Sequence, residues 1–317
     1  MPTLIEKLLL NPEHHQLRSG WQVLCFFLLW LTTNFLLLSI TYGLIAAVSG
    51  EPDINKLIES KGQLNFLIIA SQGLITALLT SAVCARYLAK RSFASIGYDT
   101  HQGWARDLGI GAIVALLMVS LVVLLQWLSR GTEFVWQPPS LAETLRGLSQ
   151  TVMLLFISAA VEELLFRGFP MQALAKNLHP GLAALLMSVP FGLVHIDNPN
   201  HTLFATINTI LAGLWLAMAY FKTRSLWFAT GLHTAWNFSL GALYGLPVSG
   251  YTQLAKTSLF SSVDHGPNWL TGSSYGPEAG ASATLVLLIA LLWLWKTKWL
   301  RITPEMARHF TKKRDNI

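Results

Sequence analysis

The chain has 317 residues, of which 53% are hydrophobic and only 12% are charged, and its formal net charge is +6. Soluble domains average about 25% charged residues, so this composition indicates an integral membrane protein. The basic excess lies mostly in loops and in the C-terminal tail. It forms no stripe interleaved with aromatic residues, which argues against a nucleic-acid partner.

Eight apolar segments resemble membrane spans, each of which needs roughly 20 mostly apolar residues in a helix. They predict an all-α fold, a polytopic bundle of about eight transmembrane helices. The eight apolar segments are 21–48, 64–86, 108–128, 149–176, 180–196, 201–221, 225–246 and 281–299.

The two cysteines lie inside apolar runs and offer neither disulfide nor zinc spacing.

The distribution of lysine and arginine predicts how the bundle is oriented. With the N-terminus inside, the inner segments carry 16 of the 22 basic residues and the outer segments carry five. The remaining one, Arg167, lies within a span. Both termini are therefore predicted to be cytoplasmic, in a bacterial plasma membrane or, for a eukaryotic chain, in the endoplasmic reticulum membrane.

Charged residues interrupt the fourth apolar segment in "SAAVEELLFRGFP", residues 158–170. Charges at such a depth are expensive and are often functional. Glu163 and Arg167 are four residues apart and share a helix face, so they are predicted to form an ion pair. Glu162 lies about 100° away on the same helix and lacks that partner, which makes it a candidate general base.

The fourth and fifth segments are predicted to form a helical hairpin with its turn at residues 177–180. In such a hairpin Glu162 and His195 lie at the same level, roughly 22–25 Å from the turn at a rise of 1.5 Å per residue. We therefore expect these two side chains to face each other inside the membrane, around an intramembrane polar cavity.

His233 and Asn237 add a third polar pair, four residues apart on one face of the seventh segment. Counted from Ser225, they lie roughly 12 and 18 Å deep, which is shallower than Glu162 by up to about 10 Å. Tilt, or a helix that starts further inward, would close that difference. Each histidine alone is often structural, so the prediction of a site depends on the coincidence of all four groups.

Three short motifs in this order resemble the CPBP family, which includes the CAAX prenyl proteases and the Abi-type bacteriocin-processing enzymes. They are "EELLFR" at 162–167, "FGLVH" at 191–195 and "HTAWN" at 233–237. The resemblance covers about 150–240. It divides the chain into N-terminal membrane helices (1–148), a catalytic core (149–246) and a C-terminal part (247–317). That last part comprises an extracytoplasmic loop, the last span and a basic cytoplasmic tail.

The resemblance implies an intramembrane endopeptidase that cleaves a membrane-associated or lipid-modified peptide. In the family's glutamate-dependent chemistry, Glu162 and His195 would polarise a water. His233 and Asn237 would donate hydrogen bonds to the oxyanion, with Glu163 and Arg167 in support.

A zinc-dependent version of the same protease is the alternative, with Glu162, His195 and His233 as ligands and an open fourth position. We prefer the version without a cofactor, because the amide of Asn237 suits an oxyanion hole and is a poor zinc ligand. A membrane immunity or scaffold protein without catalysis also stays open. A transporter is disfavoured, since no inverted repeat or pair of broken helices is seen.

Overall fold

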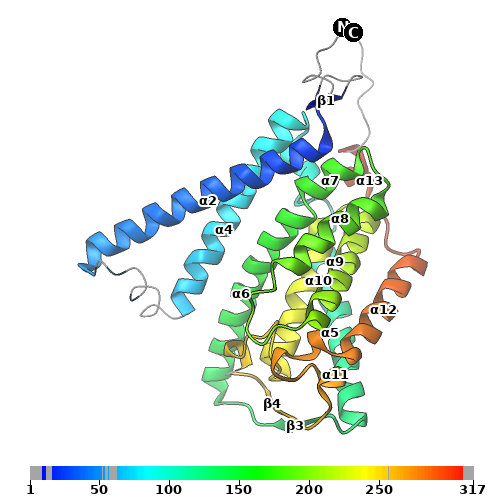
Figure 1. Cartoon of the computed structure of the whole chain (residues 1–317). Coiled ribbons are helices and arrows are strands. Elements are labelled where there is room, and N and C mark those ends of the chain that lie inside the picture. Colours follow the sequence, from blue (N-terminus) through cyan, green and yellow to red (C-terminus); the bar gives the residue numbers. More distant parts are fainter. Residues whose placement is uncertain are drawn as a thin grey trace.

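The computed structural model describes residues 9–11, 16–51, 53, 56, 63–255 and 257–309, and most of these residues are helical. This confirms the all-α fold class, and Figure 1 shows the helices as one elongated bundle with two outlying members. The main helices are α2 (Ser19–Ser49), α4 (Gln63–Val83), α5 (Trp104–Leu128), α6 (Leu141–Phe166), α7 (Phe169–Ala175), α8 (Pro180–Leu193), α9 (Leu203–Thr223), α10 (Leu226–Phe238) and α12 (Ala281–Lys296).

Short elements fill the connections between these helices. A π-helix extends α4 and another extends α10, while the long loop after α10 contains several single turns and one strand. These elements are β1 (Leu10–Asn11), β2 (Gln16–Leu17), η1 (Cys84–Leu88), η2 (Phe93–Ile96), β3 (Thr132–Trp136), η3 (Ser239–Leu243), η4 (Gln253–Ala255), β4 (Phe260–Asp264), α11 (Asn268–Thr271), η5 (Ser273–Tyr275), η6 (Pro277–Ala279) and α13 (Pro304–Arg308).

Every predicted apolar segment contains a helix, but the helices differ in their ability to cross a bilayer. Among the described residues, four are long and apolar enough to span one: α2, α4 with its η1 extension, α5 and α9. The apolar helices α8 and α12 are shorter. A span needs roughly 20 residues, so the predicted count of about eight is larger than the number of full-length spans.

The predicted span 149–176 is not one helix. Helix α6 starts earlier, at Leu141, because Ser140 and Glu143 form a capping box there. It ends at Phe166, and α7 follows after a break at Gly168. Pro170, in the first turn of α7, has no backbone N–H to continue the α6 ladder. A side chain at Gly168 would clash with the carbonyl of Leu164.

Helices α2 and α4 lean away from the rest of the bundle (Figure 1). Only 6% of the most apolar stretch of α2 is buried by the protein, against 56% in α9. Helix α9 is therefore central, while α2 exposes its apolar surface to the surroundings. Hydrogen bonds hold α2 to α4, from Thr41 to Gln72 (3.1 Å) and from Thr76 to Asn34 (3.1 Å). Such polar contacts stabilise helix pairs where water is scarce.

Two glycines bring α5 and α10 into close contact. A Cβ at Gly111 of α5 would clash with the carbonyl oxygen of Phe228, and a Cβ at Gly231 of α10 would clash with that of Leu108. Small residues at a helix crossing let the backbones approach closely. This contact fixes the position of α10, which carries two of the predicted site residues.

The two ends of the bundle differ in structure and charge. At one end, Asn177 after α7 donates to Ser19 at the start of α2 (2.6 Å), and His309 pairs with Asp99 (2.8 Å). At the other end, β3 and β4 pair antiparallel, with Thr132 opposite Asp264. Most of the described basic residues lie in segments of the first end: Arg18, Arg86, Lys90, Arg91, Arg106, Lys176, Lys222, Arg224, Lys296, Lys298, Arg301 and Arg308. The chain termini lie outside the described residues, so their cytoplasmic placement stays a prediction.

We expect Gly111→Ala to lower the melting temperature of the purified protein, because the added methyl group pushes α10 away from α5. Overpacking of this kind costs about 1–3 kcal/mol. Gly109→Ala, in the same helix, is the matched control, since no atom lies within 4 Å of its added Cβ. Equal melting temperatures for the two variants would contradict the close crossing.

Candidate active site

The first motif lies at the broken end of α6. Glu162 and Glu163 occupy its last turn, and Arg167 caps it. The side chains of Glu163 and Arg167 are 0% and 1% exposed, and the Arg167 guanidinium lies 3.2 Å from Glu163 Oε1. The expected ion pair is therefore present. A second guanidinium nitrogen donates to the carbonyl oxygen of Gly213 in α9 (3.3 Å), so the pair also joins α6 to α9.

Phe191, in the last turn of α8, packs against the first motif. Its ring lies 4.1 Å from the guanidinium carbon of Arg167 and 5.2 Å from the ring of Phe166. A cation over an aromatic face is attracted by the ring quadrupole. The phenylalanine of the second motif thus packs on the arginine of the first, and this contact positions α8 beside the end of α6.

His233 of α10 lies between the two glutamates. Its Nδ1 is 3.0 Å from Glu163 Oε1, and its Nε2 is 3.7 Å from Glu162 Oε2. A carboxylate accepts hydrogen bonds, so the contact with Glu163 places a proton on Nδ1. The ring is thereby fixed in orientation, with Nε2 directed at Glu162.

The difference in depth that residue counting gives for His233 and Glu162 is closed in the structure, because the two side chains are in contact. The physical reason lies at the start of α10. Ser225 and Leu226 are fully buried, and the Leu226 N–H donates to the carbonyl oxygen of Gly97 (2.8 Å). Helix α10 therefore begins inside the protein, beneath the segment before α5, and depths counted from a surface position at Ser225 are too small.

His195 lies two residues beyond the end of α8, in a turn. Its Nδ1 is 2.7 Å from the carbonyl oxygen of Phe191, one turn earlier. The Phe191 ring also lies beside both imidazoles, at 5.1 Å from His195 and 6.0 Å from His233. A carbonyl oxygen only accepts, so in the neutral ring Nδ1 carries the proton and Nε2 presents a lone pair.

Glu162 has a neighbour that the sequence does not predict. Its carboxylate lies against His233, and within the described part of the chain it forms no hydrogen bond or ion pair with His195. The hairpin estimate assumes one straight helix from 149 to 176. Because α6 breaks at Gly168, positions on α6 and α8 are no longer related by a simple count from the turn.

Asn237 lies one turn after His233 and is half-buried. Its side-chain amide forms no hydrogen bond with any residue that the structure describes. Its neighbour Trp236 donates to the carboxylate of Glu278 (3.2 Å). The same carboxylate accepts from the backbone N–H of Ser249 (2.6 Å) and from its hydroxyl (3.0 Å). The loop after α10 thereby holds the end of α10. Glu278 is not among the residues predicted from the sequence, because nothing marks it there except a carboxylate within a stretch rich in glycine and proline.

Exposure divides the two glutamates. The Glu162 side chain is 32% exposed, whereas Glu163 is completely buried. Part of the Glu162 side chain is therefore open to the surroundings, although its Oε2, which faces His233, is buried, and Glu163 is closed off. Of the two cavities described, one is lined by residues of α2, α7 and the α4–α5 connection, and the other, of about 510 Å³, by Gln126, Thr132 and loop residues between Gly245 and Pro277. Neither contains a predicted catalytic residue.

The side chains do not fit the alternative zinc centre as they lie here. Among the described residues, no three His, Cys, Asp or Glu side chains come close enough together to hold a metal ion. Nδ1 of His233 is engaged by Glu163, and no hydrogen bond or ion pair joins His195 to Glu162 among the described residues. The cluster is a set of acid, base and hydrogen-bonding groups.

Fold and site together define a helical membrane protein in which carboxylates, an arginine and imidazoles from three motifs are joined by direct contacts around Phe191 and His233. Residues 144–239 match the family model described as type II CAAX prenyl endopeptidase Rce1-like. All three motifs lie inside this range. The match agrees with the resemblance that the three motifs carry in this part of the chain, and it supports a membrane protease as the general class.

One relative of the chain is the uncharacterized protein YyaK of Bacillus subtilis. It is 26% identical over 221 residues, which cover 68% of this chain and 70% of the relative. The similarity thus extends beyond the range that matches the family model. No solved structure matches the chain.

We expect Glu163→Gln to lower the melting temperature, because the fully buried Arg167 loses its counter-charge. Breaking a buried ion pair costs about 3–5 kcal/mol. Glu133→Gln is the control, since its carboxylate is 64% exposed and exposed pairs contribute about 0–1 kcal/mol. A thermal melt of Glu163→Gln that matches the wild type would argue against this pairing.

Proposed function

We propose that the chain is an intramembrane endopeptidase that hydrolyses a peptide bond with Glu162 as general base. The observation that supports this most directly is the contact between Glu162 and His233, whose other ring nitrogen is held by the buried Glu163. A purely structural cluster has no need of a partly exposed glutamate whose buried, unpartnered Oε2 faces an oriented imidazole. The family match over 144–239 supports the same reaction class.

The first step is the attack of water on the peptide carbonyl carbon. Glu162 takes a proton from the water as the new carbon–oxygen bond forms, and later delivers that proton to the leaving amine. His195 assists in this proposal, because its Nε2 lone pair can accept a hydrogen bond from the same water. General-base assistance of this kind contributes roughly 10²–10⁴-fold.

The negative oxygen formed by the attack requires hydrogen-bond donors. We assign this role to His233 and Asn237, which share one face of α10. His233 can donate from Nε2 when both ring nitrogens carry protons, with Glu163 accepting from Nδ1. The Asn237 amide is not engaged by other described groups and can donate as well. Each such donor is worth about 10²–10³ in rate.

The substrate that we propose is a membrane-associated or lipid-modified peptide or protein. Glu162 is reached from within a bundle of apolar helices, so a cleavable bond must enter from the membrane or its surface. In a cell, comparison of the cut membrane peptides in the wild type and in a Glu162→Ala strain would identify the natural substrate. Peptides that are cut only in the wild type are the candidates.

We expect Glu162→Ala and His195→Ala to abolish cleavage of a membrane-proximal peptide without reducing expression, because each removes a group that activates the water. His233→Ala should lower the rate by about 10²–10³ through loss of an oxyanion donor. The measurement is single-turnover cleavage by purified protein in detergent or nanodiscs.

His265→Ala is the matched control for these variants, since His265 is 54% exposed and lies far along the chain from the three motifs. Its activity should equal that of the wild type. Wild-type activity in either Glu162→Ala or His195→Ala would refute the catalytic assignment.

Treatment with a strong zinc chelator distinguishes the two versions of the chemistry. If the side chains act alone, as we propose, the purified protease keeps its activity after chelation and dialysis. Complete inhibition that added zinc reverses would instead assign Glu162, His195 and His233 as ligands.

A further inference from the structure

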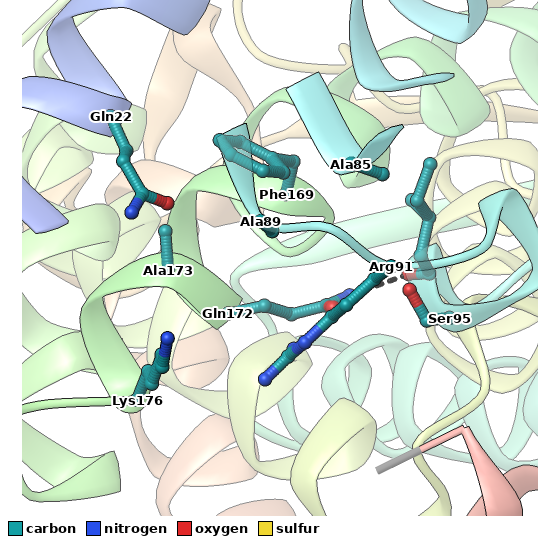
Figure 2. A pocket seen from close by; sticks show the side chains of 10 residues that line it. Gln22, Ala85, Ala89, Arg91, Ser95, Phe169, Gln172, Ala173 and Lys176 are labelled. Atoms are coloured by element: carbon teal, nitrogen blue, oxygen red, sulfur yellow. Dashed lines mark hydrogen bonds between the residues drawn. The ribbon is translucent and has the colours of Figure 1, made fainter. Parts of the chain in front are cut away.

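The carboxylate of Glu278, in η6, accepts hydrogen bonds from two segments of the chain. Its Oε1 accepts from the indole N–H of Trp236 at the end of α10 (3.2 Å). Its Oε2 accepts from the backbone N–H (2.6 Å) and the hydroxyl (3.0 Å) of Ser249. Each oxygen thus holds a different segment. This bridge lies apart from the pocket that Figure 2 shows, which is lined by residues of α2, α7 and the α4–α5 connection.

Ser249 belongs to a tight turn formed by residues 248–251. Val248 and Tyr251 make an antiparallel bridge, and both residues between them have a positive φ, 46° at Ser249 and 88° at Gly250. Two positive φ angles are what a two-residue hairpin turn of type I′ requires. Hydrogen bonds to a carboxylate are stronger than those between neutral groups, so Glu278 holds this turn firmly.

The 248–251 turn packs against the segment that carries His195. A Cβ at Gly250 would clash with the carbonyl oxygen of Pro199, so the two backbones are in direct contact. The N–H of Asn198 donates to the carbonyl oxygen of His195 (3.2 Å), which places Pro199 and His195 in one connection between α8 and α9. Through Gly250, the turn that Glu278 holds therefore supports the backbone around His195.

Trp236 anchors the other side of the bridge. Its side chain is buried, and its ring lies edge-to-face with Trp215 of α9, with 5.7 Å between the ring centroids. The indole is thus held between α9 and the carboxylate of Glu278. Asn237 is the next residue of the same helix, so fixing Trp236 also fixes the direction in which the Asn237 amide leaves α10.

We propose that Glu278 is a positioning residue that keeps Asn237 and His195 at a constant relative position. This role rests on the proposed function, in which His195 acts on the attacking water and Asn237 on the oxygen that becomes negative. Both oxygens of Glu278 are engaged by Trp236 and Ser249, so its part is geometric. It lies outside the range 144–239 that matches the family model.

Glu278→Gln tests this role with a side chain of the same size. An amide nitrogen cannot accept a hydrogen bond, so one of the two segments loses its acceptor. We expect kcat for peptide cleavage to fall roughly tenfold to a hundredfold, because a displacement of about 1 Å in an active site costs up to about 10² in rate. KM should stay within about twofold of the wild type, since no residue assigned to the site is replaced.

Two further variants separate positioning from general stability. Trp236→Phe removes the indole donor and keeps an aromatic ring, and in combination with Glu278→Gln it should add little to the loss of kcat, because both changes break one bridge. Glu143→Gln is the matched control: its carboxylate also accepts from the N–H and hydroxyl of one serine, Ser140, at the start of α6. It should lower the melting temperature and leave kcat unchanged. A wild-type kcat in Glu278→Gln, or losses that multiply in the double variant, would overturn the positioning role.

Hydrogen–deuterium exchange tests the bridge without relying on cleavage. Amides in residues 195–202 should exchange faster in Glu278→Gln than in the wild type, while Glu143→Gln should leave them unchanged. Unchanged exchange of these amides in Glu278→Gln refutes the bridge even if the protease is active. Absence of cleavage by the wild type would refute the proposed function instead, so the two failures are distinguishable.

Discussion

The buried carboxylate of Glu163 is the group on which the arrangement of the site depends. It is completely buried, and one of its oxygens faces both the Arg167 guanidinium at 3.2 Å and the His233 ring at 3.0 Å. A buried charge is tolerated only where it is paired and hydrogen-bonded. The two contacts therefore constrain α6 and α10 to one relative position, and the contact of Arg167 with Gly213 extends this constraint to α9. Both contacts use Oε1, while Oε2 of Glu163 is buried and accepts no hydrogen bond from the described residues.

The break after Arg167 makes this geometry possible. The carbonyl oxygen of Glu163 accepts from the N–H groups of both Arg167 and Gly168, each at 2.8 Å, and α6 ends there. In a continuous helix the arginine would lie at mid-helix with its backbone in regular geometry. At the helix end, its side chain instead lies among Glu163, Gly213 and the ring of Phe191. Gly168 and Pro170 are thus as much part of the site as the charged residues, although neither has a side chain that takes part in chemistry.

Local patterns predict this protein well, and long-range geometry less so. The apolar segments locate the helices, and the four-residue spacing of Glu163 and Arg167 predicts their ion pair. The sequence does not reveal that the Glu162 carboxylate lies 3.7 Å from His233, because this depends on where α6 breaks and on how deep α10 begins. Nothing in the sequence around Ser225 indicates that this residue is buried. Its burial depends on the segment around Gly97, which is distant along the chain and contacts the start of α10 in the folded protein. The contact of Glu278 with Trp236 crosses 42 residues, and no periodicity connects a loop carboxylate to a helix so distant along the chain.

The two histidines illustrate a common way to set an imidazole for catalysis. In each, Nδ1 is held by an oxygen acceptor: the Phe191 carbonyl for His195 and the Glu163 carboxylate for His233. These acceptors fix the tautomer and direct the chemistry to Nε2. They differ in charge, and this difference separates the roles. In the proposed reaction, the neutral carbonyl on Nδ1 leaves the Nε2 lone pair of His195 available to a water, whereas the carboxylate on Nδ1 of His233 lets its Nε2 act as a hydrogen-bond donor. Groups fixed in this way need little reorganisation when charge develops on the substrate, and such preorganisation is the largest contribution to catalysis in many enzymes.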